Sequence, residues 1–531
     1  MKTRQIIALI LACLMLAAVF TGCAAKPTEE AKTGKTQTEE NGKESIFNVG
    51  SIPIVNEPIT LKVLTPDPSG YMYSAAADSG YWDFLEEKTG IHFEIESYSA
   101  EELANKLPLI MATPDQMPDL FLFCNLKESD IINYASTGQL LKLNDLIEEY
   151  GSNIKTMFTE STTARGASVI YDGSIYGLPA LNGSPAEVLY AINTRFLENC
   201  GLSVPTTLEE LAEDMKIMRT MDANGDGVVG NELLWSCEPK HFKRYALSMV
   251  GISAYWPWQG VIMDDHDGEV FFVPTSEEYK YLLSVLRDMY AEGCIDPEIF
   301  TQTPDEYYAK FYQDLVFISE RFDDPQSDAF SGMDGWKFIT PLYSKVNDEA
   351  IYGIGADYQA FAGLVSANTK YPEICMLLLD YMYSEEASMV SYYGFEGTDY
   401  VVKSQEPFYA ESASPDFDIR FGYNSFPAPR WLRPEMVNTP STELLQEKEQ
   451  MKTEYGRFGW QSYVHLSPEQ SDTVSVLGTD LGLFCDDYWV GFITGAYDLE
   501  KDWDGYVKQC ESMGVAELVA VYQAAYNSFF E

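Results

Sequence analysis

An acidic loop in the middle of the sequence has the residue types that bind a hard metal cation. The loop reads DANGDGVVGNE, and Asp222, Asn224 and Asp226 stand at its first, third and fifth positions. Gly227 follows at the sixth position, where a calcium-binding loop needs glycine for a sharp turn. Oxygen ligands at alternate positions suit a hard cation such as Ca²⁺. We therefore predict a calcium site with a structural role.

The remaining ligands of this predicted site are Val228 and Glu232. Val228 would supply its backbone carbonyl from the seventh position, and Glu232 would supply its carboxylate from the eleventh. An EF-hand loop carries its glutamate one position later, where this chain has Leu233. Asn231 is the alternative to Glu232. The alternative for the whole loop is a surface turn rich in Asp, Asn and Gly that binds no metal.

The sequence offers little for covalent catalysis. Its four histidines are far apart, and no HExxH, GxSxG or phosphate-binding P-loop motif occurs. The 82 acidic residues offer many carboxylate pairs of the kind that glycoside hydrolases use, yet no pair stands out. The net charge of −47 disfavours nucleic-acid binding, because neutralising phosphates requires a basic surface.

The N-terminus is typical of a bacterial lipoprotein. Two basic residues precede a continuous apolar run over residues 6–20, which is too short for a membrane span and ends shortly before Cys23. We predict a signal peptide over residues 1–22, acylation of Cys23, and a flexible polar tether over residues 23–57. This anchors the protein at the extracytoplasmic face of the cell membrane. The alternative is an ordinary cleaved signal peptide or an N-terminal membrane anchor.

The cysteines do not form a recognisable framework. Cys13 leaves with the signal peptide and Cys23 is lipidated, so seven of the nine remain. These seven are scattered, without a CxxC pair or zinc spacing, and their odd number leaves at least one thiol free unless it pairs with another chain. We expect most of them to be buried as small apolar residues, and we do not expect a disulfide framework.

Strands and helices alternate in the part of the chain that follows the tether. The patterns predict strands at 58–67, 91–99 and 120–123, and helices at 79–90 and 100–113. This order indicates a parallel, doubly wound α/β sheet. Farther along, Thr206 or Thr207 is positioned to cap a helix whose first turn contains Glu209 and Glu210.

Five stretches, spread from about residue 84 to near the C-terminus, carry a family resemblance. They are FLEEKTGIHFEIESYS with NKLPLIMATPDQMPDLF, DGSIYGLP with LYAINTRFLENCGLSVPTTLEEL, DANGDGVVGNE, MYAEGCIDPEIF, and YGFEGTDY with WDGYVKQCESMGVAELVAVYQAAYNSF. In this order, and behind a lipobox, they resemble the extracellular solute-binding lipoproteins of bacterial ABC sugar importers. The resemblance is strongest to the large, acidic members found in Firmicutes.

The resemblance implies an α/β fold of the periplasmic-binding-protein type, with two lobes, a hinge and an interlobe cleft. Residues 58–531 would form the solute-binding domain, with 58–180 mostly in the N-terminal lobe and 190–340 mostly in the C-terminal lobe. The remainder would be shared, and the chain would pass between the lobes more than once. The implied protein is a monomer that binds a carbohydrate, an oligosaccharide above all, docks on the transmembrane subunits of an ABC permease, and catalyses no reaction.

Aromatic residues make up 14% of the chain, and aromatic rings bind the C–H faces of sugars while polar groups bind the hydroxyls. Five aromatic residues in loop-like segments are predicted to contact the ligand: Trp235, Tyr255, Trp256, Trp258 and Trp431. The resemblance places two further contacts, Glu396 and Tyr400, in a segment that faces the cleft. The alternative for each ring is packing in a core or between lobes.

Two other functions stay open on the sequence. One is a surface glycoside hydrolase or lyase, which shares aromatic-rich sugar chemistry but needs a carboxylate pair. The other is a peptide-binding or sensory lipoprotein of the same fold.

Overall fold

The computed structural model describes most of the chain after the tether. The described residues are 45–67, 80–184, 189–253, 260–321, 335–405, 408–413, 428–437 and 443–530. The signal peptide and Cys23 therefore lie outside the described residues, as do Tyr255, Trp256 and Trp258. Within the described residues, no helix is both long enough and apolar enough to cross a membrane.

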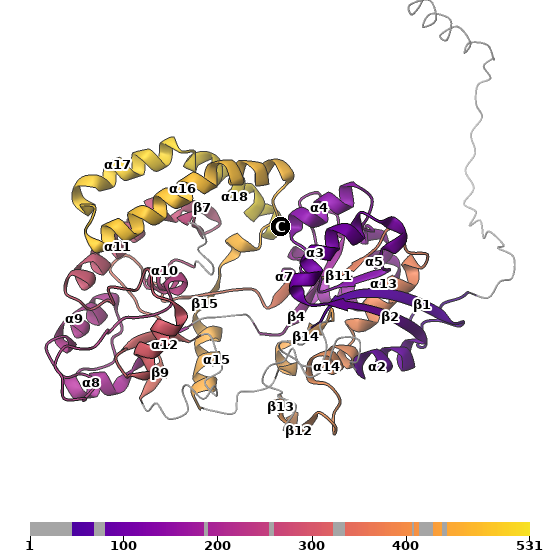
Figure 1. The fold of residues 1–531 in the computed structure, drawn as a ribbon, viewed down its shortest axis with the longest axis horizontal. Helices are drawn as coiled ribbons and strands as arrows, with labels where there is room; N and C mark the ends of the chain where they lie inside the picture. Colours follow the sequence, from indigo (N-terminus) through magenta and orange to yellow (C-terminus); the bar gives the residue numbers. More distant parts are fainter. Residues whose placement is uncertain are drawn as a thin grey trace, which may run out of the picture. The chain divides into compact units, whose positions relative to one another are not determined.

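One part of the chain is built on a sheet of six strands (Figure 1). We call this part the first lobe. The strand order is β14 (Trp431–Leu432), β4 (Gly177–Asn182), β11 (Tyr358–Val365), β3 (Leu120–Leu122), β1 (Ile59–Pro66) and β2 (Ile91–Tyr98). Strands β1, β2 and β3 are mutually parallel, β14 is parallel to β4, and β11 is antiparallel to both β3 and β4. The sheet is thus parallel except for β11.

The alternation of side chains along the strands gives this sheet an apolar core on each face. Leu120 and Leu122 belong to one buried cluster, whereas Phe121 between them belongs to the other. Successive residues of a strand point to opposite faces, so a wholly apolar strand must be covered on both sides. The helices of this lobe are α2 (Gly80–Thr89), α3 (Ala100–Met111), α4 (Glu128–Ser136), α5 (Asn144–Tyr150), α6 (Ser152–Glu160), α7 (Thr162–Gly166), α13 (Pro372–Met382) and α14 (Glu385–Tyr393).

A second part of the chain, the second lobe, has its own core around three strands. The strand order is β8 (Ile318–Arg321), β5 (Leu189–Asn193) and β9 (Trp336–Phe338). Its helices are α8 (Thr194–Cys200), α9 (Leu208–Met218), α10 (Pro239–Ser248), α11 (Glu277–Ala291) and α12 (Pro304–Tyr312), and β6 (Met263–His266) pairs with β7 (Glu269–Phe272) as a hairpin. These elements share one buried hydrophobic cluster.

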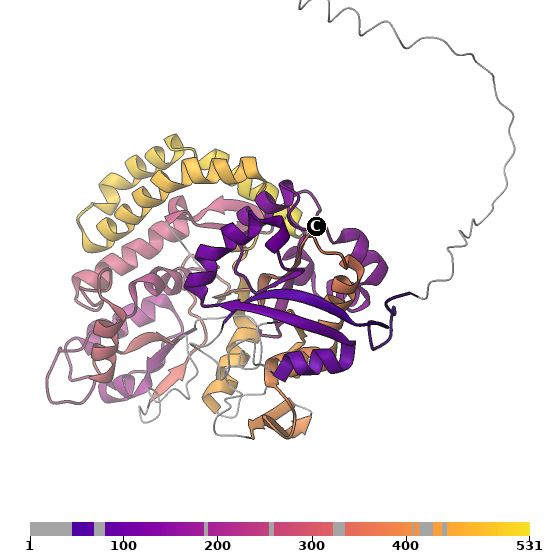
Figure 2. The same cartoon turned by 45° about the vertical axis from the view of Figure 1, so that its right-hand side comes forward.

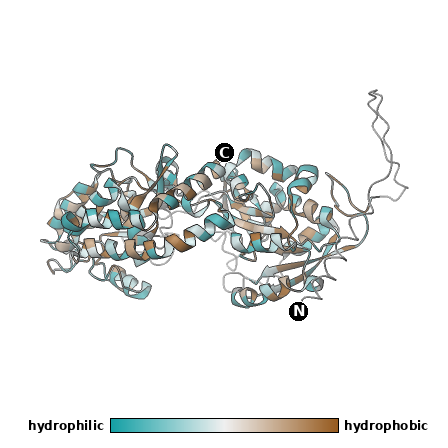
Figure 3. Ribbon diagram, turned by 90° about the horizontal axis from the view of Figure 1, so that it is seen from above, coloured by the Kyte–Doolittle hydropathy of each residue, from teal (hydrophilic) through white to brown (hydrophobic). Residues whose placement is uncertain are grey.

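Three C-terminal helices complete the second core. They are α16 (Pro468–Thr494), α17 (Leu499–Ser512) and α18 (Val515–Phe530). The three helices form one yellow group in both Figure 1 and Figure 2, in which α16 packs on α11 and both α17 and α18 pack on α16. Figure 3 shows hydrophilic and hydrophobic colours alternating along the helices, as expected for helices with one face packed on a core and one in water. The last residues of the chain therefore belong to the same core as β5.

The chain passes between the two cores three times within the described residues. The passes join β4 to β5, β9 to β11, and β14 to α16. The second includes β10 (Tyr352–Ile354) and the third includes α15 (Glu443–Tyr455) and β15 (Gly456–Phe458), and β10 pairs with β15 in parallel. The other elements are the hairpin β12 (Tyr400–Gln405) and β13 (Phe408–Ser412), and 3-10 turns at Pro114–Gln116, Val273–Thr275, Pro434–Met436 and Trp460–Ser462.

An ion pair with a buried carboxylate joins the third pass to the second lobe. Nη2 of Arg457 lies 3.0 Å from Oδ1 of Asp264, whose side chain is almost fully buried. Backbone N–H groups of Ser253 and Asp265 also donate to this carboxylate. Burial raises the pKa of Asp264, and the adjacent Arg457 guanidinium opposes that rise. The paired charges hold β15 against β6 because separating them would leave a carboxylate unpaired in the core.

The structure confirms the expected α/β architecture and most of the local predictions. Strands form at β1, β2 and β3, and helices form at α2 and α3, with Pro108 inside α3. Thr207 is the N-cap of α9, where its side chain accepts a hydrogen bond from the backbone N–H of Glu210. The antiparallel β11 was not expected, because its partners are far from it in sequence.

Two glycines in the C-terminal helices give a direct test of the packing. A methyl group at Gly491 of α16 would lie 2.1 Å from Cδ2 of Tyr497, whereas one at Gly505 of α17 would meet no described heavy atom within 4 Å. We expect Gly491→Ala to lower the free energy of unfolding by about 1–3 kcal/mol through overpacking. The matched change Gly505→Ala should instead raise it by about 0.5–1 kcal/mol. Thermal unfolding of the two variants checks this, and equal effects would contradict the described packing.

Candidate functional site

The carboxyl ends of the parallel strands of the first lobe meet at one edge of the sheet. Strands β3, β4 and β14 run in the same direction, because β3 and β4 both oppose β11 and β14 is parallel to β4. Ligands of open α/β sheets bind beyond the carboxyl ends of the strands. The residues that end or follow these strands are therefore the first candidates for a binding site.

The side chain of a buried arginine, Arg430, reaches this edge through its contact with Asn182. Arg430 directly precedes β14, has 0% relative exposure, and donates from Nε and Nη2 to Oδ1 of Asn182, at 3.1 and 3.0 Å. Asn182 is the last residue of β4. The guanidinium carbon also lies 5.9 Å from the ring centroid of Phe123 and 5.3 Å from that of Tyr392. A cation, an amide and two aromatic rings thus gather at the edge.

The backbone near this group is in an uncommon conformation. Phe123 and Asn125, which follow β3, have φ angles of 54° and 53°. Non-glycine residues rarely adopt positive φ, and such conformations cluster at ligand-binding and active sites. The peptide N–H of Phe123 donates to the carbonyl of Ala362 in β11, at 2.8 Å, which holds the turn in place. The strained turn supports the assignment of this edge as the candidate site.

Trp431, a predicted ligand contact, is adjacent to this group but is not an open platform. Its side chain is 6% exposed and belongs to the core of the first lobe. The guanidinium of Arg433 lies 4.2 Å from its ring centroid, so a cation covers this ring. Arg430 was missed by the sequence argument, although it is the direct neighbour of Trp431. The tryptophan was the only signal that marked this segment.

Glu396 and Tyr400 are brought together by a short bridge at the start of β12. Glu396 is exposed, whereas Tyr400 is 6% exposed and packs against Tyr393 with ring centroids 5.6 Å apart. Burial raises the pKa of the Tyr400 hydroxyl, and the nearby Glu396 and Asp399 carboxylates raise it further. Glu396 is therefore the member of this pair whose polar group faces solvent.

Trp235 lies in the core of the second lobe. It is 1% exposed, and its ring meets Phe242 edge to face with centroids 5.1 Å apart. Its backbone bridges to Ile295 and Ile318. This burial is that of a packing residue, so we do not include Trp235 in the proposed site. The aromatic candidates Tyr255, Trp256 and Trp258 lie outside the described residues.

The acidic loop is held together by hydrogen bonds to its own backbone. The carboxylate of Asp222 accepts from the N–H groups of Gly225 and Gly227, both at 2.9 Å. The carboxylate of Asp226 accepts from the N–H of Val228 at 2.8 Å and from Nδ2 of Asn231 at 2.7 Å. These bonds lower the pKa of Asp226, so its side chain is ionised at neutral pH.

Two acceptor oxygens in this loop are buried without a hydrogen bond. Glu232 is 0% exposed; its Oε1 accepts from the N–H groups of Ala223 and Asn224, whereas its Oε2 has no partner among the described residues. Oδ1 of Asn231 is likewise buried and unpartnered there. Within the described residues, no three Asp, Glu, His or Cys side chains are grouped as around a metal ion. The loop therefore presents spare oxygens, but its carboxylates do not converge.

His465 joins the third pass to the first lobe. Its Nε2 lies 2.8 Å from the carbonyl oxygen of Gly166 in α7, and its Nδ1 lies 2.9 Å from Oε1 of Glu128 in α4. A cavity of about 290 Å³ adjoins this contact, lined by Arg165, Gly166, Val169, His465, Ala525, Ser528 and Phe529. Residues from α18 of the second core and from α7 of the first thus share one cavity.

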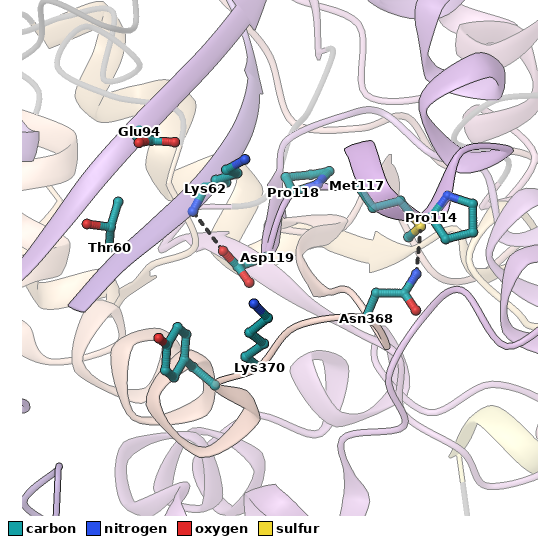
Figure 4. A pocket seen from close by; sticks show the side chains of 10 residues that line it. Thr60, Lys62, Glu94, Pro114, Met117, Pro118, Asp119, Asn368 and Lys370 are labelled. Atoms are coloured by element: carbon teal, nitrogen blue, oxygen red, sulfur yellow. Dashed lines mark hydrogen bonds between the residues drawn. The ribbon is translucent and has the colours of Figure 1, made fainter.

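A larger cavity, of about 560 Å³, lies at the opposite edge of the first lobe (Figure 4). Its lining includes Lys62, Asp119 and Lys370, and the carboxylate of Asp119 accepts from the backbone N–H of Lys62 at 2.8 Å. Asp119 directly precedes β3, so this cavity lies at the amino ends of the parallel strands. Because ligands of such sheets bind at the carboxyl ends, we do not assign the candidate site to this cavity.

The His465 contact can be tested by substitution. We expect His465→Leu to lower the free energy of unfolding by about 1–3 kcal/mol, because it removes both polar contacts and leaves Glu128 Oε1 buried. The matched control is His266→Leu, because the His266 side chain is 62% exposed. Thermal unfolding at neutral pH compares the two, and an unchanged midpoint for His465→Leu would contradict the described contact.

A family model described as bacterial extracellular solute-binding protein matches residues 63–389. The fructooligosaccharide ABC transporter substrate-binding protein FusA of Streptococcus pneumoniae serotype 4 is 22% identical over 479 residues, which is 84% of this chain and 86% of that protein.

Two solved structures have a similar fold. An HMO-binding, ABC-transporter-associated solute-binding protein from Bifidobacterium longum infantis matches with a TM-score of 0.73 and 19% identity, over 89% of this chain and 99% of that one. An EF-hand mutant of S. pneumoniae FusA in complex with fructo-nystose matches with a TM-score of 0.67 and 19% identity, over 88% of this chain and 99% of that one.

Proposed function

We propose that this chain, which belongs to the bacterial extracellular solute-binding protein family, binds a carbohydrate and delivers it to an ABC importer. The observation that carries the proposal is the nearly end-to-end similarity to FusA, whose name states a fructooligosaccharide ligand. The side chains at the carboxyl edge of the first lobe suit the same class of ligand. Asn182 supplies an amide for hydroxyls, Arg430 holds that amide in place, and neighbouring aromatic rings supply apolar surface.

The charge of the chain narrows the class of ligand. A protein with a net charge of −47 repels anions at long range. We therefore propose a neutral oligosaccharide and disfavour uronates, sulfated sugars and sugar phosphates. The Arg430 cation is already engaged by Asn182 and by aromatic rings, so it is not placed as a separate anion receptor.

The proposed mechanism is closure of the two lobes on the ligand. A ligand stabilises the closed form only by the contacts that it makes there and not in the open form. The three passes of the chain provide the segments about which such a motion turns. The closed form then docks on the permease, and the sugar is bound without turnover. This scheme requires no nucleophile and no acid–base pair.

The proposal includes the position of the protein at the membrane. Acylation at Cys23 and the polar tether over residues 23–57 would keep a monomeric binding domain close to the permease. Because the anchor holds ligand-binding domain and permease on one surface, their effective concentration is high. The tether therefore serves delivery and takes no part in ligand recognition.

The ligand class is tested by a binding screen on the purified protein. Neutral oligosaccharides, uronate oligomers and peptides are titrated while tryptophan fluorescence is followed, and the mixtures are then separated by chromatography. We expect a saturable change with a neutral oligosaccharide and no shorter products. Steady release of shorter sugars would identify an enzyme, and saturation by peptides alone would identify the peptide-binding alternative.

Arg430 is tested by a conservative change. We expect Arg430→Lys to weaken sugar binding at least tenfold, about 1.4 kcal/mol, because lysine cannot reproduce the two-nitrogen contact to Asn182. Arg287→Lys on α11, in the other lobe, is the matched control. Affinities are measured by calorimetric titration, with thermal unfolding to show that each variant is folded. Equal affinity for wild type and Arg430→Lys would remove this edge from the site.

We propose separately that the acidic loop binds Ca²⁺. The spare oxygens of Asn231 and Glu232 and the ionised Asp226 fit a hard cation, and the FusA structure compared above is of an EF-hand mutant. Asp222, Asn224, Asp226, the Val228 carbonyl and Glu232 would hold the ion. It would supply no chemistry and would fix the loop that joins α9 to Trp235.

Metal removal tests the calcium proposal. We expect calcium at a hundredfold excess over its Kd to stabilise the protein by about 2.7 kcal/mol relative to a chelator. Glu232→Gln should lose this difference, whereas Glu213→Gln should keep it, because the Glu213 side chain is 70% exposed on α9. The measurement is the thermal unfolding midpoint with calcium and with chelator. If the wild-type midpoint is the same in both, the loop is a surface turn that binds no metal.

A further inference from the structure

Two cysteines of the C-terminal helices lie in contact. The described residues contain seven cysteines. Among these, the sulfur atoms of Cys485 and Cys510 lie 3.9 Å apart. Cys485 belongs to α16 and Cys510 to α17, and these helices pack against each other. Both side chains are fully buried in the core of the second lobe. The two thiols are therefore held face to face by tertiary structure, 25 positions apart in sequence.

We propose that Cys485 and Cys510 are a modification site, at which a two-electron oxidant forms a disulfide that links α16 to α17. A disulfide has an S–S length of about 2.05 Å, so side-chain rotation must bring the sulfurs about 1.9 Å closer than they are as thiols. The proposed bond concerns stability and redox state, and it is independent of the ligand proposed above.

The surroundings of the pair favour reaction at Cys485. The hydroxyl of Tyr506 donates to Sγ of Cys485 at 3.4 Å, and the thiols of Cys485 and Cys510 are in a hydrogen-bonding contact in which either can donate. The hydrogen bond between the sulfurs lowers the pKa of the Cys485 thiol and raises the pKa of the Cys510 thiol. Since the thiolate is the reactive form, Cys485 is the first nucleophile and Cys510 is the resolving thiol.

The oxidant must be small because the pair is buried, and hydrogen peroxide has the required size. The Cys485 thiol gives up its proton, the thiolate attacks one peroxide oxygen, the O–O bond breaks, and the leaving hydroxide takes up the released proton to become water. The resulting sulfenic acid is attacked by the Cys510 sulfur, which forms the S–S bond and releases a second water. Two thiols thus lose two electrons, and one peroxide is reduced to two waters.

The position of the proposed disulfide between α16 and α17 would stabilise the folded protein. The bond would close a loop from the middle of α16 through the turn at residues 495–498 to the end of α17. Cross-linking restricts the unfolded chain, so the disulfide form should unfold at a higher temperature. Disulfides persist in oxidising compartments outside the cytoplasm, which is where proteins of this extracellular family reside.

The test is direct mapping of the sulfur atoms in the purified full chain. The protein is prepared with reductant, freed of it, and treated with hydrogen peroxide or left untreated; free thiols are then alkylated and the digest is examined without reduction by mass spectrometry. We expect a peptide pair joined through Cys485 and Cys510 in the treated sample, and alkylation of both in the untreated one. The thermal midpoint of the treated protein should rise by several degrees.

Variants separate this bond from other oxidation. Cys510→Ser should abolish both the joined peptides and the rise in midpoint, whereas Cys375→Ser, which changes a buried cysteine of the first lobe, should keep both. If a variant does not fold, the peptide mapping of the wild-type protein still shows whether the disulfide forms. Recovery of Cys485 and Cys510 as alkylated thiols after treatment, or joined to other cysteines, would overturn the proposal.

Discussion

Each of the two hydrophobic cores is closed by segments that lie far apart in the sequence, and this forces the chain to pass between them repeatedly. In the six-stranded sheet, β11 lies between β3 and β4, and β14 lies beside β4, although the other four strands all end before residue 183. The second core includes helices that begin after residue 467. Neither core can be completed by a continuous stretch of chain. The Arg457–Asp264 pair and the His465 contacts then fix the third pass against both parts.

This constraint also determines where functional side chains gather. The first pass leaves the sheet just after Asn182, and the third leaves it just after the segment that contains Arg430 and Trp431. Because β14 lies beside β4 and runs parallel to it, both exits occur at the same edge. A binding site between hinged lobes needs its polar groups where the chain leaves one core for the other. The edge with Arg430, Asn182 and Phe123 meets that need.

Local elements were predictable from the sequence because their signals are local. The apolar strand predicted at 120–123 and the Thr207 cap are each encoded within a few residues, and both are present in the structure. The site was less predictable, because Arg430 and Asn182 are 248 positions apart and no periodicity relates them. Trp235 shows the reverse case. It lacks an obvious pattern in the sequence, yet it is a core residue because distant segments close over it.

The acidic loop and the cysteine pair show how the same core carries features beyond ligand binding. Both belong to the second lobe, and in both the decisive information is burial, of Glu232 in one case and of Cys485 with Cys510 in the other. In the sequence the cysteines are scattered, whereas in the structure the packing of α16 on α17 brings two of them together.

If a neutral oligosaccharide is bound by closure of the two lobes, the protein becomes more compact when it is saturated with sugar. Small-angle X-ray scattering of the free and the sugar-saturated protein measures this change. We expect a smaller radius of gyration in the saturated sample, with the sugar recovered intact. An unchanged radius of gyration at full saturation would contradict closure of the two lobes.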